Sequence, residues 1–227
     1  MRRLVAAVLC AGLFAALVGV LPGPRERVAD LPQAVATNLG DSGVAHPVTA
    51  VLLNFRSFDT LLEIGVLLLA VVVALALRDA QPDPPERLSR PNPLLRAVMA
   101  WLLPLMLLVA SYLLWAGSTR PGGAFQAGAV LAAAGVLLRL AGLRLPGLDR
   151  RRVTRVLLVA GLALFVAVGL LPLTWGDALL QYPPQHAGAL ILAVECLLTL
   201  GIALALLSLF RLAPPPAPDA QRREERP

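Results

Sequence analysis

The chain has 227 residues, of which 58% are hydrophobic and only 15% are charged. Soluble domains carry about 25% charged residues, so this composition excludes an ordinary water-soluble protein and indicates one that lies in lipid. The net charge of +6 comes from arginines placed in short clusters beside apolar runs, which fits membrane orientation and does not indicate nucleic-acid binding.

The first half of the chain contains two apolar runs that could cross a membrane, which takes about 20 helical residues. The first run, Leu4 to Leu21, follows two arginines. This pattern fits a retained anchor or a cleaved signal peptide, and we expect the anchor. A polar connection rich in proline and glycine occupies residues 22–47, and the second run spans about Thr60 to Leu77.

A proline-rich segment, residues 79–93, contains five prolines and alternating charges. Proline blocks helix continuation and disfavours helix in the residue before it, so this segment predicts an extended linker. It separates a module of two helices, residues 1–78, from a module of four, residues 94–212. A charged, proline-rich tail follows at residues 213–227, and we expect it to be disordered.

The second module contains four further apolar runs. They span Leu94 to Ala116, Ala124 to Leu143, about Val156 to Leu171, and Ala187 to Leu212. The sequence therefore predicts an all-α integral membrane bundle of about six transmembrane helices.

The distribution of arginine predicts the orientation of this bundle, because cytoplasmic loops near helix ends are rich in basic residues. With the amino terminus inside, the inside segments contain Arg2, Arg3, Arg78, Arg87, Arg90, Arg96, Arg144, Arg150, Arg151, Arg152, Arg155, Arg211, Arg222, Arg223 and Arg226. The outside segments contain only Arg25, Arg27, Arg56 and Arg120. This excess of about four to one favours six spans with both termini in the cytoplasm.

Acidic residues near the start of the second run are the first candidates for ion translocation, since ionisable groups at membrane depth are costly and often functional. Asp59 and Glu63 lie four residues apart and therefore share one helix face, and Arg56 precedes them. Asp59 is also a suitable first-turn carboxylate at a helix amino terminus. Glu63 lies one turn deeper, where we expect it to face protein or water and to relay protons or contact a cation.

The last apolar run contains the most deeply placed acid of the chain, Glu195. Two interpretations are equally open for it. One is a protonated carboxyl group that hydrogen-bonds to a neighbouring helix, and the other is a group that handles protons during transport.

Three further residues are expected to give structural or electrostatic support. Gly122 and Gly123 permit a tight turn and a close helix approach before the fourth span. Arg139, near the inner end of that span, is expected to reach the membrane interface with its charged end.

Catalytic and cofactor-binding patterns are absent from the sequence. It contains no Ser-His-Asp order, metal-ligand cluster, haem motif or nucleotide fingerprint, so we expect no enzyme activity, no cofactor and no metal centre. Cys10 and Cys196 lie far apart in apolar runs, and we expect both to be small buried hydrophobic residues.

Residues Arg90 to Phe125 resemble the MnhB/MrpB subunit family of Mrp-type Na+/H+ antiporters, through a helix, Gly117 and the turn Pro121-Gly122-Gly123-Ala124-Phe125. The resemblance continues to residue 212. The chain departs from the family pattern at Ala193, where an aspartate is usual, and Glu195 is a nearby carboxylate.

Residues Val51 to Glu63, with Asn-Phe-Arg-Ser-Phe-Asp-Thr-Leu-Leu-Glu, are similar to the MbhE-type module, which also occurs near the carboxyl end of the large MrpA subunit. This resemblance implies that Arg56, Asp59 and Glu63 occupy the family's polar cluster at the membrane edge.

The two resemblances imply a multi-pass inner (plasma) membrane subunit of a multi-subunit, non-redox antiporter that exchanges Na+ or another monovalent cation for protons. Its partners would be other Mrp/Mnh-type subunits and the lipid bilayer, with no nucleic acid. Two alternatives remain open. The subunit could belong to the ion-translocating part of a membrane-bound hydrogenase or a complex I relative, or it could be a purely structural scaffold.

Overall fold

The computed structural model describes residues 8, 11–12, 14–15, 30–79, 93–143, 151–175, 179–183 and 185–212. These residues form helices and connections, with no strand among them. The chain divides into two compact units, residues 1–37 and 38–227. Most of the predicted first span, most of the predicted linker and the whole predicted tail lie outside the described residues.

The first unit contributes most of one short helix, α2 (Leu31–Asn38), which has no buried residue. The second unit contains all the other elements of the described chain. In chain order they are η1 (Leu39–Ser42), α3 (Pro47–Ala50), the π-helix η2 (Val51–Phe55), α4 (Ser57–Asp79), α5 (Pro93–Ala116), α6 (Ala124–Leu140), α7 (Arg151–Leu170), η3 (Leu171–Trp175) and α8 (Ala187–Leu212).

Four helices in the described part of the chain, α4, α5, α7 and α8, are long and apolar enough to cross a membrane. The apolar helix α6 has 17 residues, which is at the lower limit for a span. The prediction of a helical membrane bundle is therefore confirmed, and five of the six predicted runs are helices within a few residues of their expected bounds. The remaining run, which is the first in the chain at residues 4–21, stays a prediction.

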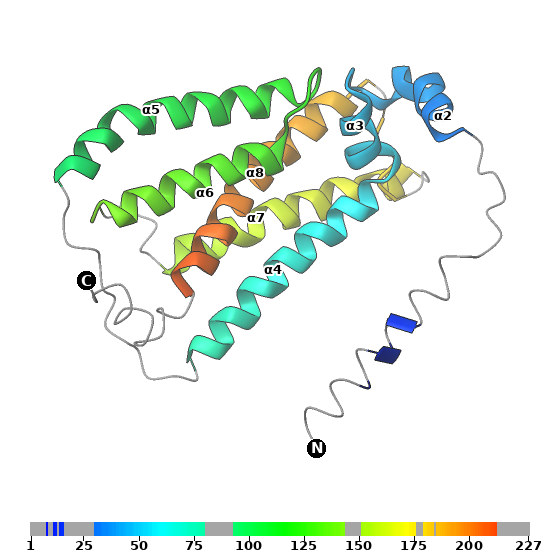
Figure 1. Ribbon diagram of the computed structural model, residues 1–227. Helices are drawn as coiled ribbons and strands as arrows, with labels where there is room; N and C mark the ends of the chain where they lie inside the picture. Colours follow the sequence, from blue (N-terminus) through cyan, green and yellow to red (C-terminus); the bar gives the residue numbers. More distant parts are fainter. Residues whose placement is uncertain are drawn as a thin grey trace. The chain divides into compact units, whose positions relative to one another are not determined.

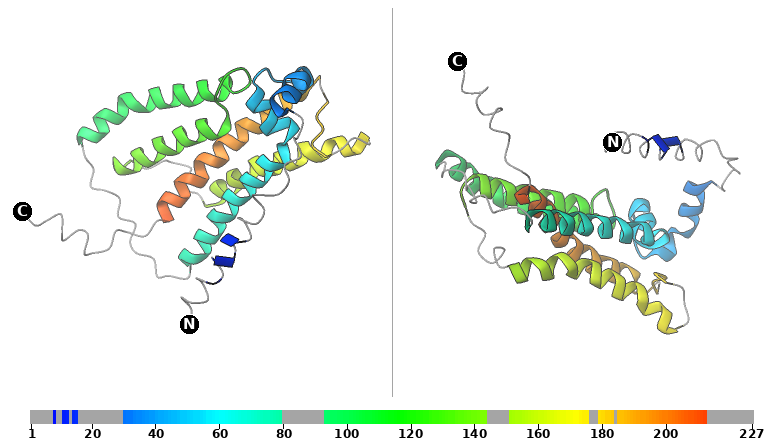
Figure 2. Two further views of the ribbon diagram at one scale, coloured as in Figure 1. Left: turned by 45° about the vertical axis from the view of Figure 1, so that its right-hand side comes forward. Right: turned by 90° about the horizontal axis from the view of Figure 1, so that it is seen from below.

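Helix α8 lies at the centre of the second unit. In Figures 1 and 2 it runs between α6 on one side and α4 and α7 on the other, while α5 packs mainly against α6. Half of the α8 span is buried inside the chain, compared with 17% of the α4 span and 11% of the α5 span. Consequently, α4 and α5 present most of their surface outward, and α8 provides the surface on which the other helices pack.

Small residues on α6 allow its close approach to α8. The buried residues of α6 are Ala124, Ala127, Gly128, Ala132, Ala134, Gly135 and Leu138. Because lipid is as apolar as the side chains, membrane helices associate through this kind of close packing rather than through water exclusion.

The carboxyl end of α6 is closed by a glycine motif. Gly142 has a φ of +70°, and the Leu143 N–H donates to the Leu138 carbonyl oxygen at 2.9 Å. The Arg96 guanidinium of α5 donates to the Ala141 carbonyl oxygen at 3.2 Å. These bonds satisfy carbonyl groups that the helix end leaves free and attach α5 to α6.

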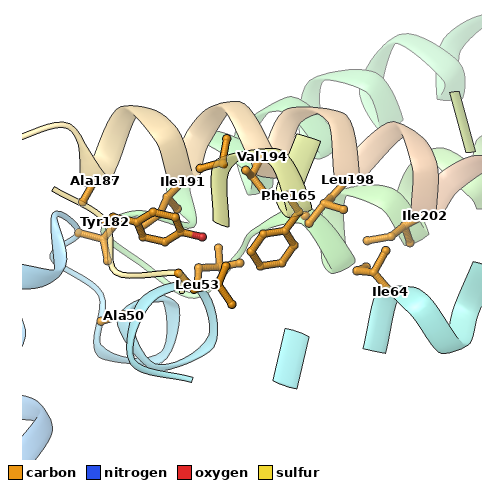
Figure 3. Packing of buried hydrophobic residues seen from close by; sticks show 14 residues of the cluster. Ala50, Leu53, Ile64, Phe165, Tyr182, Ala187, Ile191, Val194, Leu198 and Ile202 are labelled. Carbon is orange, nitrogen blue, oxygen red and sulfur yellow. The ribbon is translucent and has the colours of Figure 1, made fainter. Parts of the chain in front are cut away.

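The main hydrophobic core joins the two predicted modules. Phe165 of α7 is fully buried, and its ring lies among side chains of α4, α8 and the segment that precedes α4 (Figure 3). Leu53 and Ile64 come from the predicted first module, while Phe165 and Leu198 come from the second. Residues 44–64 therefore pack as part of the same unit as α7 and α8.

Helical structure between residues 31 and 55 was not expected from the sequence pattern. Part of this region was expected to be a polar connection, yet it contains α2, α3 and η2. Pro47 occupies the first turn of α3, a place where a missing N–H costs nothing. The wider turn at η2 is marked by the Arg56 N–H, which donates to the Val51 carbonyl oxygen at 2.7 Å.

Candidate functional site

The turn between α5 and α6, residues 117–123, ends in a backbone conformation that favours glycine. Gly123 has a φ of +110°, a conformation that other residues rarely adopt. A Cβ atom on Gly122 would collide with the Leu113 carbonyl oxygen. The Gly123 N–H donates to that same oxygen at 2.9 Å, which fixes the chain as it enters α6.

Glu195 of α8 lies against the amino terminus of α6. Its side chain is buried, with 3% of the residue exposed, and Oε1 accepts a hydrogen bond from the Ala124 N–H at 3.3 Å. The N-cap residue, Gly123, has no side chain with which to cap the helix. Glu195 supplies that missing cap from another helix.

Space for this carboxyl group depends on the same glycine. A Cβ atom at position 123 would lie 2.8 Å from Oε1 of Glu195. The α8 backbone is also tied locally, because the Thr199 hydroxyl donates to the Glu195 carbonyl oxygen at 2.7 Å. The structure thus brings together three of the predicted site residues, Glu195, Gly122 and Gly123.

Two opposing effects act on the Glu195 carboxyl group. The positive end of the α6 dipole and the Ala124 N–H stabilise a carboxylate, whereas removal from water penalises one. A buried carboxyl group in such a place can serve as a structural cap or can take up and release a proton. Both interpretations given by the sequence therefore remain compatible with the geometry.

The glycine turn is also held by the segment that precedes α4. The Gly117 carbonyl oxygen accepts a hydrogen bond from the Thr49 hydroxyl. The Ser118 carbonyl oxygen accepts from the N–H groups of Ala45 and His46 at 2.9 and 3.0 Å. A displacement of the turn would therefore disturb contacts in both predicted modules.

A second polar place lies at the start of α4. Arg56 and Asp59 form an ion pair in which both side chains are partly exposed, and Asp59 lies in the first turn of the helix. Glu63 lies one turn further on and is exposed, whereas its neighbour Ile64 is buried in the core. The exposed Glu63 and the buried Glu195 thus belong to separate places in the fold.

Arg139 lies in the last turn of α6 and is partly buried. It is 15 residues from Ala124, which corresponds to roughly 22 Å along the helix. A basic side chain in this position interacts favourably with the carboxyl end of the helix dipole. Arg139 is therefore far from Glu195 and belongs to the opposite end of the bundle.

Several residues around these places were not singled out from the sequence. Thr49 and Thr199 gave no signal of their own, because single threonines in apolar runs are common. Tyr182, between α7 and α8, is packed in the main core, and burial raises the pKa of its phenol to about 12, so it stays neutral. Cys196, which the sequence predicts as buried, is exposed, because it is one step around α8 from the side that faces α6.

Among the described residues, no group of three or more His, Cys, Asp or Glu side chains is arranged to hold a metal ion. The carboxyl groups at the two places can bind and release protons or accept hydrogen bonds.

A family model described as "Domain related to MnhB subunit of Na+/H+ antiporter" matches residues 94–211. This stretch includes α5, the glycine turn, α6, α7 and nearly all of α8. No curated protein matches the chain.

Two solved structures have a similar fold. One is a chain of the membrane-bound sulfane sulfur reductase (MBS), an archaeal respiratory membrane complex. It is 21% identical with a TM-score of 0.65, and the alignment covers 93% of this chain and 98% of that one. The other is a chain of the Mrp complex from Dietzia sp. DQ12-45-1b. It is 23% identical with a TM-score of 0.60, and the alignment covers 96% of this chain but only 26% of that one.

Proposed function

We propose that this chain, which belongs to the family of domains related to the MnhB subunit of Na+/H+ antiporters, is a multi-pass membrane subunit of a complex that exchanges Na+ or another monovalent cation for protons. The observation that carries the proposal is the family match over residues 94–211. The fold shared with a chain of an Mrp complex supports it. The partners of the chain would be other antiporter-type subunits.

Within such a complex we assign the ion-handling role of this chain to its membrane acids. Glu195 is buried at the end of a neighbouring helix, where a change of its protonation would alter the α6 amino terminus and the glycine turn. Asp59 and Glu63 lie at the start of α4. Glu63 is exposed, so a neighbouring subunit could contact it. The chain itself would carry no redox centre and would support exchange driven through the whole complex.

Reconstitution of the complex in liposomes with and without this chain tests the proposal. We expect that a Na+ gradient drives proton movement only when the chain is present. Unchanged exchange in a correctly assembled complex that lacks the chain would contradict the function. A complex with both Glu63→Gln and Glu195→Gln separates ion handling from scaffolding, because a scaffold would retain normal exchange after both substitutions.

A second candidate function is membership of a redox-driven ion pump. It is favoured by the similarity to a chain of an archaeal respiratory membrane complex, whose alignment covers almost the whole of both chains. The genes beside this one distinguish the candidates. Neighbours that encode iron-sulfur or other redox subunits would support the pump, whereas neighbours that encode only antiporter subunits would support the antiporter.

A further inference from the structure

The exposed face of α4 consists of Leu62, Glu63, Val66, Leu69, Val73 and Leu77, which recur at helical spacing on the side opposite the core. Four of the apolar members are at least half exposed in the chain, and Val66 reaches 66%. Five of these six side chains suit lipid or an apolar partner equally well. The sixth, Glu63, does not suit lipid.

In a bilayer centred on the apolar span of α4, Glu63 lies at the depth of the hydrocarbon region. The apolar span of α4 runs from Ser57 to Leu77, with its midpoint at Leu67. Glu63 is four residues from this midpoint, which corresponds to about 6 Å along the helix, and the hydrocarbon region extends about 15 Å to each side. An acid at this depth needs a hydrogen-bonding partner or water.

The described part of the chain does not supply that partner. Arg56, the basic residue nearest to Glu63 in the sequence, forms an ion pair with Asp59. The groups that pack against α4 meet its other face, where Ile64 and Val71 are buried. The Glu63 carboxyl group therefore points away from the described helices that pack against α4.

The exposed face of α5 differs from that of α4. After Arg96, near its start, α5 contains no acidic or basic residue. Trp101 and Leu108 are 86% and 67% exposed, and Trp115 pairs with Tyr112 near the end of the helix, where aromatic rings suit the membrane interface. This largely apolar surface suits contact with lipid.

We infer that the exposed face of α4 is covered by a transmembrane helix of a different subunit, and that this helix presents a hydrogen-bond donor to the Glu63 carboxyl group. The inference rests on the proposed membership of a multi-subunit complex. Charge complementarity selects the occupant, because neither lipid nor the apolar face of a partner helix satisfies a carboxyl group. It also explains why an acid is present on a face that the described helices leave open.

Site-specific photocrosslinking in the intact, purified complex tests this placement. A photoreactive residue at Val66 is compared with one at Leu108, since both sites lie in mid-span and their exposures, 66% and 67%, are matched. We expect Val66 to crosslink to another polypeptide, identified by mass spectrometry, and Leu108 to crosslink to lipid. Lipid adducts alone from Val66, or a crosslink to a second copy of this chain, would overturn the inference.

Substitution of Glu63 tests the hydrogen bond. Glu63→Leu removes the acceptor and suits lipid better, so a lipid-facing position would tolerate it or become more stable. We instead expect retention of the crosslinked subunit to fall about five- to tenfold for Glu63→Leu and to change little for Glu63→Gln, which keeps an acceptor oxygen. Equal retention by both variants would refute the assigned hydrogen bond.

These outcomes are independent of the transported ion. If the complex is a redox-driven pump, reconstituted antiport will fail while the Val66 crosslink to a different subunit persists. If the α4 inference is wrong, antiport can persist while Val66 reacts only with lipid.

Discussion

Gly123 determines whether Glu195 can reach the amino terminus of α6. Its φ of +110° suits glycine, and its missing side chain leaves room for the carboxyl oxygen. Because the residue at the N-cap cannot bond its own helix, the acid from α8 takes that role. The backbone conformation of Gly123 and the position of the Glu195 side chain are therefore linked, although Glu195 is 71 residues from Ala124, whose N–H it accepts.

Gly123→Ala should destabilise the chain for two reasons. The alanine must adopt a strained φ, which costs about 1–3 kcal/mol, and its Cβ must displace Oε1 of Glu195. Thermal unfolding of the purified complex in detergent measures the loss. Gly201→Ala is the matched control, since its Cβ would lie 3.7 Å from the nearest backbone oxygens, an ordinary contact. Equal melting temperatures for the two variants would show that the turn is not constrained as described.

Substitutions of Glu195 should separate its structural role from proton handling. Glu195→Leu leaves the Ala124 N–H without its acceptor, a loss of about 1–3 kcal/mol, whereas Glu195→Gln can still accept that bond. We expect normal assembly and reduced proton movement for Glu195→Gln, and weaker assembly for Glu195→Leu. Full transport by a well-assembled Glu195→Gln complex would assign Glu195 to helix capping alone.

The parts of this site were visible in the sequence, but their contact was not. An acid in an apolar run and a Gly-Gly turn each give a clear signal. Nothing in a single sequence states that the two meet, because the pairing of membrane helices depends on which small residues face each other. The exposure of Cys196 has the same cause, since α8 is apolar on all sides and its pattern shows no preferred face.

At the scale of elements, the contact between α6 and α8 depends on glycines that differ in their surroundings. A Cβ on Gly128 would lie 2.9 Å from the branched Cβ of Ile202 and 3.1 Å from the Thr199 carbonyl oxygen. A Cβ on Gly135 would meet only the far end of the flexible Leu207 side chain, at 3.0 Å. The same helix pair is therefore tightly packed near the amino end of α6 and adaptable near its carboxyl end.

We expect Gly128→Ala to cost about 1–3 kcal/mol, because the backbones must separate, and Gly135→Ala to cost less than about 1.5 kcal/mol, because Leu207 can change rotamer. Urea or detergent-denaturant titration of the purified complex measures the difference. If Gly135→Ala is as harmful as Gly128→Ala, the α6–α8 interface is uniformly rigid, and the different surroundings of the two glycines do not govern its packing.

Long helices were predictable because each needs about 20 apolar residues to satisfy its backbone in lipid. The boundaries of α5 and α8 follow from prolines and charges on either side. The short elements α2, α3 and η2 were not predictable, since four to eight residues give no clear period. The π-helical turn at η2 is bonded to the next helix, because the Thr60 hydroxyl of α4 donates to the Leu52 carbonyl oxygen at 2.7 Å.

At the scale of the whole molecule, the packed unit of residues 38–227 crosses the boundary that composition predicts at residues 79–93. Gly43 contacts the start of α8, Thr49 bonds the glycine turn, and Leu53 enters the main core. A linker is predicted at residues 79–93 because proline and charge are concentrated there. The contacts that join the two predicted modules could not be predicted, since they are made by single small or apolar residues. The orientation inferred from the arginines stays a prediction.

This attachment predicts that the two parts of the chain remain associated after cleavage within the predicted linker, residues 79–93. With a protease site inserted between Asp83 and Pro84, we expect both fragments to copurify in detergent after cleavage, because Val44, Ala50, Leu53 and Ile64 are buried in a core that they share with α7 and α8. Gly43→Ala should weaken this association, since Gly43 has a φ of +76° and an added Cβ would lie 2.7 Å from the Gly188 nitrogen. Gly40→Ala is the control, with no atom within 4 Å of the added Cβ. Separation of the unsubstituted fragments, or equal copurification of the Gly43 and Gly40 variants, would show that this contact does not join the two modules.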